Sequence, residues 1–450
     1  MQGAAQNDHS IERADAGVTA ETTREAVPQR AVVEPTRGMI STSSPPQDLR
    51  WPAAFGSRLV CSVGGASGEG AAVAQQWTVL DWDEADETRT ASWRSESGTP
   101  LPKRVVLADD RFPADVAYRL ACEGTAILWQ GDFHNARQLL SALARRVDRK
   151  RRREPADSVA LTFHQHRRDQ TRRARILGML VIRVEAGCVI PLRRAPDLSD
   201  ACLAAGCPED EPFVLSLREL LGINGSYEWR EKGVDVPALG ARVHPHYGVF
   251  SPVRGEYVDL VAEAPLPARA SLTSAVDVGT GTGVLAAVLA QRGVSRVVGT
   301  EQDERALACA RDNIARLDLA DRVSIVPADL FPASRFGLAV CNPPWLPAKP
   351  VSRLDRAVYD PGGRMLHAFL TRLPQHLEPG GEGWLILSDL AELLGLRTRH
   401  ELLDRIRDAG LRVADRLDTE PAHPRANDPR DPLHAARAAE TTSLWRLIPR

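Results

Sequence analysis

The 450-residue chain has no long apolar run and no set of cysteines at metal-ligand spacing. Because no run reaches the roughly 18 apolar residues of a membrane span, we expect no membrane partner. The N-terminus is polar and lacks the apolar core of a signal peptide, which favours a cytoplasmic protein. The seven cysteines include no CxxC pair, so we expect reduced thiols and no metal site.

Neither sign of charge predominates in the chain as a whole. The 57 Lys and Arg residues are balanced by 59 Asp and Glu residues, which excludes a global attraction to nucleic acid or membranes. A local exception is the basic block at residues 145–175, with 12 basic and 4 acidic residues. This basic block predicts either contacts with RNA phosphates or a solvated helical face.

Aromatic residues are absent from residues 1–50, which are rich in Ala, Thr, Ser, Pro and Glu. This composition predicts a disordered tail. Tryptophans enter from residue 51, and we expect an N-terminal α+β region over 51–240 that recognises the substrate. Within this region, apolar residues at helical spacing predict a helical stretch over 112–153. Residues 241–450 are expected to form the catalytic domain.

Strand-like apolar runs alternate with amphipathic helices in the C-terminal half. The runs are 275–278, 296–300, 323–326, 337–341 and 384–387, and 303–317 is one of the helical stretches. This alternation predicts an α/β fold with a parallel sheet. Two more strand-like runs, 411–419 and 442–448, follow with no clear helix between them. We therefore expect a seven-stranded Rossmann-like sheet whose last strand is antiparallel, with the segment between these two runs overhanging the carboxyl edge.

A glycine-rich loop joins the first of these strands to the next helix. Its sequence, Asp277-Val278-Gly279-Thr280-Gly281-Thr282-Gly283, has GxGxG spacing and lacks the dinucleotide GxGxxG fingerprint. Glycines permit a tight turn and a close approach of a ligand to the backbone, although a simple turn has the same composition. Glu301 ends the next strand, where a carboxylate can accept hydrogen bonds from ribose hydroxyls. Asp329 and Leu330 follow the third strand, where they can bind an adenine amino group and pack against its ring.

The tetrapeptide Asn342-Pro343-Pro344-Trp345 follows the strand at 337–341. A planar nitrogen is a poor nucleophile because its lone pair is delocalised. The Asn342 side-chain oxygen and the Pro343 carbonyl can each accept one N–H from such a nitrogen, and Trp345 can stack on a flat substrate. Without the other motifs, a rigid proline turn beside a buried tryptophan would also explain the tetrapeptide.

Taken in this order, the motifs resemble those of class I S-adenosylmethionine-dependent methyltransferases. The resemblance implies an S-adenosylmethionine cofactor and a catalytic role for the tetrapeptide Asn342-Pro343-Pro344-Trp345. It also implies a cofactor site made of Phe250, Asp277, Gly279, Thr280, Gly281, Thr282, Gly283, Glu301, Asp329, Leu330 and Asn342.

Two groups of these enzymes share the tetrapeptide. One is the HemK type, in the methyltransferase small-domain family, which methylates glutamine side chains of release factors or ribosomal proteins. Leu346-Pro347, the 249–256 segment and Asp360-Pro361-Gly362-Gly363-Arg364 are similar to this type, although Trp345 replaces its tyrosine. The other group methylates exocyclic amines of RNA or DNA bases. We expect glutamine methylation of a translation protein, with base methylation as the alternative and an inactive RNA-binding module as a third hypothesis.

Overall fold

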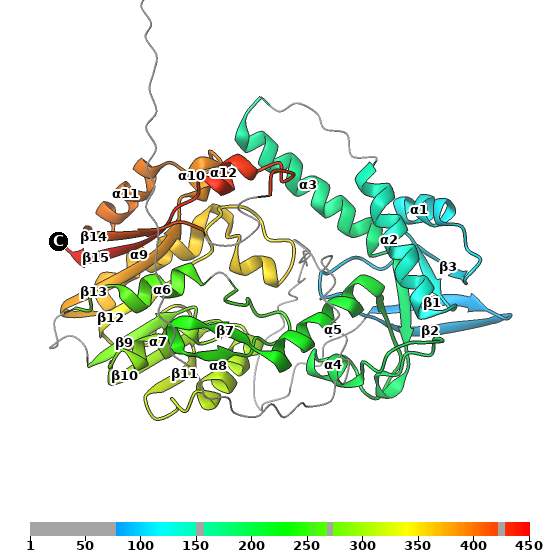
Figure 1. The fold of residues 1–450 in the computed structure, drawn as a ribbon, viewed down its shortest axis with the longest axis horizontal. Helices are drawn as coiled ribbons and strands as arrows, with labels where there is room; N and C mark the ends of the chain where they lie inside the picture. Colours follow the sequence, from blue (N-terminus) through cyan, green and yellow to red (C-terminus); the bar gives the residue numbers. More distant parts are fainter. Residues whose placement is uncertain (1–77, 150–156, 254, 268–272, 422–427) are drawn as a thin grey trace, which may run out of the picture. The chain divides into compact units, whose positions relative to one another are not determined.

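The computed structural model describes residues 78–149, 157–253, 255–267, 273–421 and 428–450, all within one compact unit. The predicted tail at 1–50 and residues 51–77 lie outside this described part. Two large sheets dominate the described residues (Figure 1). Each sheet has its own apolar core.

The C-terminal sheet has seven strands in the order β11-β10-β9-β12-β13-β15-β14. Strand β15 pairs antiparallel with both β13 and β14, whereas the pairs among β9 to β13 are parallel. The predicted seven-stranded sheet with an antiparallel last strand is therefore confirmed. Its strands are β9 (Ser274–Val278), β10 (Arg296–Glu301), β11 (Val323–Pro327), β12 (Phe336–Cys341), β13 (Leu377–Ser388), β14 (Leu411–Thr419) and β15 (Thr442–Pro449).

Helices cover both faces of this sheet. Alternate strand residues such as Ala275 and Val340 pack against α6, α7 and α8, while Val276 and Ala339 pack against α9 and α11. Since both faces are covered, the central strands are continuously apolar. The helices are α6 (Glu256–Glu263), α7 (Val284–Gln291), α8 (Glu304–Arg316), α9 (Arg364–His376), α10 (Leu390–Leu393), α11 (Arg399–Asp408) and α12 (His434–Ala438).

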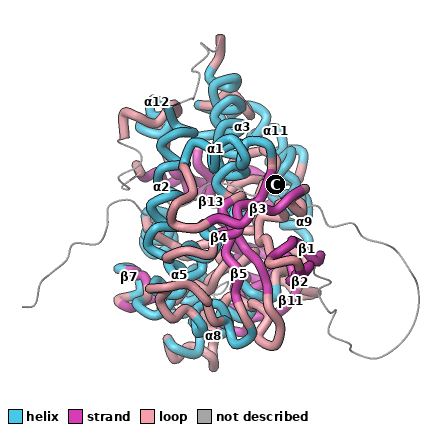
Figure 2. The backbone as a smooth tube through the Cα atoms, turned by 90° about the vertical axis from the view of Figure 1, so that its right-hand side faces the viewer, coloured by secondary structure: helices cyan, strands magenta, loops and turns pink. Residues whose placement is uncertain are grey.

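The N-terminal sheet has six strands in the order β1-β2-β6-β5-β4-β3. Figure 2 shows β3, β4 and β5 beside α1 and α2. The strands are β1 (Thr78–Glu84), β2 (Glu87–Trp93), β3 (Arg104–Ala108), β4 (Thr125–Trp129), β5 (Leu180–Val184) and β6 (Phe213–Ser216). The helices are α1 (Ala114–Glu123), α2 (Phe133–Arg149), α3 (Val159–Leu177), α4 (Ser199–Ala204) and α5 (Leu217–Lys232). A separate hairpin, β7 (Val234–Val236) and β8 (Ala241–Val243), follows α5.

The predicted continuous helical stretch over 112–153 is wrong in its middle. Gly124 adopts a left-handed conformation, with φ of 83°, and ends α1. The next five residues form the fully buried strand β4, which pairs with β3 and β5. A short apolar run can be a buried strand or a helix segment, and here the pairing partners decide. In the described ranges, no helix has the length and apolar character needed to cross a membrane.

Candidate functional site

A cavity of about 1030 Å³ lies at the carboxyl ends of the central strands. Loops after β9, β10, β11 and β12 each contribute to it, as expected for a ligand site in an open parallel sheet. Its lining includes Phe250, Asp277, Gly279, Thr280, Gly281, Thr282, Glu301, Asp303, Asp329, Leu330, Asn342, Pro344 and Trp345. The structure thus brings together nearly all of the predicted site residues. Gly283 and Pro343 are not among the lining residues.

Asp277 stabilises the glycine loop through hydrogen bonds. Its Oδ2 accepts hydrogen bonds from Thr280 Oγ1 at 2.6 Å and from the Ala286 amide at 3.1 Å. Burial raises the pKa of Asp277 to about 6, although these hydrogen bonds oppose the shift. Gly279 has φ of 73°, and an added Cβ would lie 2.8 Å from Met365 Cε. The left-handed conformation therefore favours glycine at this position, whereas the flexible end of Met365 could move to admit a Cβ.

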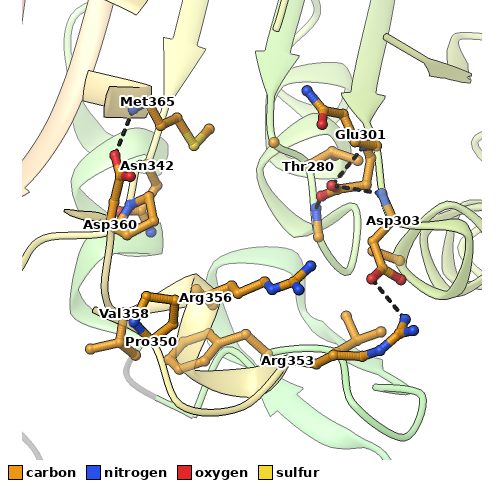
Figure 3. A pocket seen from close by; sticks show the side chains of 18 of the residues that line it. Thr280, Glu301, Asp303, Asn342, Pro350, Arg353, Arg356, Val358, Asp360 and Met365 are labelled. Atoms are coloured by element: carbon orange, nitrogen blue, oxygen red, sulfur yellow. Dashed lines mark hydrogen bonds and ion pairs between the residues drawn. The ribbon is translucent and has the colours of Figure 1, made fainter. Parts of the chain in front are cut away.

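Glu301 connects the end of β10 to the glycine loop. Its Oε1 accepts from the amides of Gln302 at 2.8 Å and Asp303 at 3.2 Å, and its Oε2 accepts from the Gly281 amide at 3.4 Å. These bonds fix the carboxylate at the cavity edge (Figure 3). Because a carboxylate has about four acceptor positions and three are used here, about one remains for a ligand hydroxyl.

The Asp329-Leu330 pair forms another side of the cavity. The Asp329 side chain is 75% exposed and forms an ion pair with Arg372 at 3.1 Å. Leu330 has φ of 67°, an uncommon conformation for a bulky residue. The Thr300 hydroxyl donates to the Leu330 carbonyl at 2.6 Å and holds this conformation. Such local strain is often found at ligand sites.

The tetrapeptide at residues 342–345 follows the buried strand β12. The indole Nε1 of Trp345 donates a hydrogen bond to Asn342 Oδ1 at 2.8 Å. The Trp345 ring is half-buried and packs against the apolar cores on both faces of the sheet. Asn342 is thus held at the cavity by its own motif.

Two further acidic residues, Asp303 and Asp360, line the cavity but were not predicted as site residues from the sequence. Asp303 caps α8 through the Arg305 amide at 2.9 Å, and its Oδ2 accepts from Arg353 Nη1 at 3.2 Å. Asp360 Oδ2 accepts from the Met365 amide at 2.6 Å. The N-cap position of Asp303, before an amphipathic helix, was the one signal that could have identified it.

Two other predicted features, the basic block and the overhanging segment between β14 and β15, lie only partly within the described residues. In the basic block, Arg173 pairs with Asp148 at 2.9 Å and Arg167 pairs with Asp355 at 3.2 Å; residues 150–156 lie outside the description. In the predicted overhang between β14 and β15, residues 422–427 lie outside it. Leu433 and Ala436 from this segment pack with Leu346, but none of its described residues lines the cavity.

Comparisons with known proteins agree with the motifs. Residues 240–394 match the Methyltransferase small domain family. The release factor glutamine methyltransferase of Caulobacter vibrioides is 34% identical over 123 residues, which are 24% of this chain and 43% of that protein. The tRNA1(Val) (adenine(37)-N6)-methyltransferase of Porphyromonas gingivalis is 41% identical over 88 residues, 18% of this chain and 34% of that protein. The chain thus spans less than half the length of these relatives.

A putative protein N5-glutamine methyltransferase of Methanocaldococcus jannaschii is 24% identical over 188 residues, 40% of this chain and 88% of that protein. Among solved structures, a SAM-dependent methyltransferase from Thiobacillus denitrificans in complex with S-adenosyl-L-homocysteine has 17% identity and a TM-score of 0.31, covering 45% of this chain and 92% of that one. The predicted resemblance to the methyltransferase small-domain family is confirmed for the C-terminal part of the chain.

Proposed function

We propose that this chain is an S-adenosylmethionine-dependent N-methyltransferase whose acceptor is a glutamine side chain of a translation protein. One observation carries the proposal: Asn342, Pro344 and Trp345 of the tetrapeptide, residues 279–282 of the glycine loop and Glu301 line a single cavity at the carboxyl ends of the parallel strands.

The residues present fit S-adenosylmethionine. Gly281 has φ of 55° and nothing lies within 4 Å of the Cβ it lacks, so the loop leaves room for a ligand against its backbone. Glu301 presents a carboxylate for ribose hydroxyls, and Leu330 offers an apolar wall for the adenine ring. Asp329 would take the adenine amino group, and Phe250 would cover the ligand.

The tetrapeptide supplies the acceptor side of the reaction. S-adenosylmethionine, when bound, carries an activated methyl group on a sulfonium sulfur. Asn342 Oδ1 and the Pro343 carbonyl would each accept an N–H of the acceptor nitrogen, which favours its pyramidal form with an available lone pair. The indole of Trp345 uses one lone pair of Asn342 Oδ1 and leaves the other for the acceptor. In-line positioning by these residues can lower the barrier by up to roughly 7–11 kcal/mol.

Methylation of an exocyclic base amine is the second candidate. The similarity to a tRNA adenine methyltransferase supports it, because glutamine amides and adenine amines are both planar nitrogens. The continuation Leu346-Pro347 and the similarity to two kinds of glutamine methyltransferase favour the amide.

A labelling experiment distinguishes these functions. The protein is incubated with methyl-labelled S-adenosylmethionine and an extract containing ribosomes and release factors, with Asn342→Ala as the control. We expect label in macromolecules that is lost to protease and resists nuclease. Label lost only to nuclease would show a base acceptor. If label is absent with both protein and nucleic-acid acceptors, the inactive module is the better explanation.

A further inference from the structure

The loop that follows the tetrapeptide forms the wall of the cavity opposite the cofactor residues. This loop, residues 346–360, contributes Lys349, Arg353 and Tyr359 to the lining. Its two ends are tied together, because the Leu346 amide donates to the Val358 carbonyl at 3.1 Å and the Asp360 amide donates to the Leu346 carbonyl at 2.9 Å. The conformation of the 346–360 loop therefore shapes the acceptor side of the cavity.

Arg167 of helix α3 binds the middle of this loop. Its Nη1 lies 3.2 Å from Asp355 Oδ2, and its Nη2 donates to the Lys349 carbonyl at 2.8 Å. The guanidinium also lies 3.8 Å from the centre of the Tyr359 ring. The Arg167 and Asp355 side chains are only 12% and 8% exposed, so this pair is shielded from solvent. The planar guanidinium satisfies three points of the loop at once, which a lysine cannot do.

Asp355 connects the Arg167 guanidinium to the loop backbone. Its Oδ2 accepts from the Val351 amide at 3.1 Å, and its carbonyl accepts from the amides of Val358 at 3.0 Å and Tyr359 at 2.8 Å. One turn before Arg167 on the same helix, Phe163 is buried against Leu346. Helix α3 therefore holds the loop by an ion pair and by apolar packing.

A second anchor comes from the segment after β2. Glu96 Oε1 lies 2.9 Å from Arg305 Nη1 and 3.2 Å from Arg353 Nε. The Glu96 amide in turn donates to Glu219 at 3.1 Å, and Glu219 pairs with the buried Arg94 at 2.9 Å. Arg353 extends from the loop toward Asp303 beneath the cavity (Figure 3). Two sites of the N-terminal region, distant in sequence, thus hold one loop.

We propose that the N-terminal region sets the geometry of the acceptor site through the 346–360 loop, with Arg167 and Glu96 as positioning residues. The catalytic consequence of this inference rests on the proposed methyltransferase function, whereas the contacts that hold the loop do not depend on it. Neither residue lines the cavity, so both act through the loop. Loss of Arg167 removes its contacts with Asp355, with the Lys349 carbonyl and with the Tyr359 ring, so the loop should open more readily.

The test compares Arg167→Met with Arg168→Met, which removes a neighbouring exposed arginine of the same helix. Hydrogen exchange is followed by mass spectrometry, and S-adenosylhomocysteine binding by calorimetry. In Arg167→Met we expect amides of residues 346–360 to exchange at least about tenfold faster, because local opening no longer breaks the Arg167 contacts. The dissociation constant of S-adenosylhomocysteine should stay within about twofold, while kcat/KM for the acceptor falls about tenfold or more.

Glu96→Gln, which weakens the second anchor without touching α3, should raise exchange in the same peptides. Unchanged exchange in the loop would overturn the proposal. So would equal acceleration in β9, because Arg167 would then stabilise the whole fold instead of positioning the loop. A wild-type protein that binds no S-adenosylhomocysteine would contradict the proposed function and leave the exchange result standing.

Discussion

The indole Nε1 of Trp345 donates a 2.8 Å hydrogen bond to the side-chain oxygen of Asn342, three residues before it. The bond fixes the rotation of the Asn342 amide, and Asn342 lines the same cavity as the glycine loop. A tryptophan at this position therefore does more than offer a flat ring. Its indole N–H donates this bond, and the rings of phenylalanine and tyrosine have no N–H donor at that place.

Replacement of Trp345 by phenylalanine tests this relationship. Trp345→Phe keeps an aromatic ring but leaves the Asn342 amide free to rotate. We expect kcat to fall about tenfold, the equivalent of one lost hydrogen bond, with cofactor affinity unchanged. Steady-state kinetics and calorimetry measure the two quantities, and wild-type turnover in Trp345→Phe would mean that the indole bond has no role in positioning.

Removal of the Asn342 side chain separates chemistry from cofactor binding. Asn342→Ala should bind S-adenosylhomocysteine within about twofold of wild type, whereas kcat should fall by roughly a hundredfold or more, because an acceptor of the reacting N–H is lost. Single-turnover measurements with saturating cofactor give the rate. Activity close to that of wild type would exclude the proposed mechanism.

We propose that Glu301 binds the cofactor ribose. Glu301→Ala should weaken S-adenosylmethionine binding by about 1–3 kcal/mol, the contribution of hydrogen bonds to a charged acceptor. Glu304→Ala is the matched control, since Glu304 is an exposed carboxylate nearby that does not line the cavity. Equal affinities of the two variants in calorimetry would remove Glu301 from the site.

Asp277 should make the stability of the fold depend on pH. Burial raises its pKa from 3.8 to about 6, so between these values the folded state retains a proton that the unfolded state has released. This group's contribution to the free energy of unfolding is therefore complete below about pH 4 and is lost as pH rises through about 6.

Asp277→Asn keeps an oxygen acceptor for Thr280 and Ala286 but cannot titrate. Relative to wild type, the variant should gain stability as pH rises from 4 to 6, by up to about 1.4 kcal/mol per pH unit. Urea unfolding across this range measures the difference. Parallel stability curves for the two proteins would show that Asp277 does not bind a proton in the folded state.

The local signals of the C-terminal half were strong enough to predict its fold. Apolar runs of strand length, separated by amphipathic helices, specify a parallel sheet, and the glycine loop, Glu301, Asp329 and Asn342 stand at successive strand ends. Topology then carries these residues to one edge without further information, because all parallel strands end on the same side. This is why positions far apart in sequence could be assigned to one site.

The strand β4 shows where such reasoning fails. Thr125 and the four apolar residues after it, between two helical patterns, have no distinctive period, and only their pairing with β3 and β5 makes them a strand. The basic block shows a similar limit. Its arginines have the same composition whether they face RNA or protein, and Arg167 faces Asp355 of a distant loop.

The sequence by itself thus determined the parallel sheet, its antiparallel last strand and the residues at its carboxyl edge, because periodicity and motif order are local properties of the chain. Only the tertiary structure decided that Trp345 orients Asn342, that Glu96 and Arg167 hold the 346–360 loop, and that β4 lies within the N-terminal sheet. Some of these contacts join distant parts of the chain: Glu96 and Arg353, for example, are 257 positions apart in the sequence. The identity of a side chain does not indicate which distant residue it will contact, because such pairs form only when the packing of both sheets brings the two residues together.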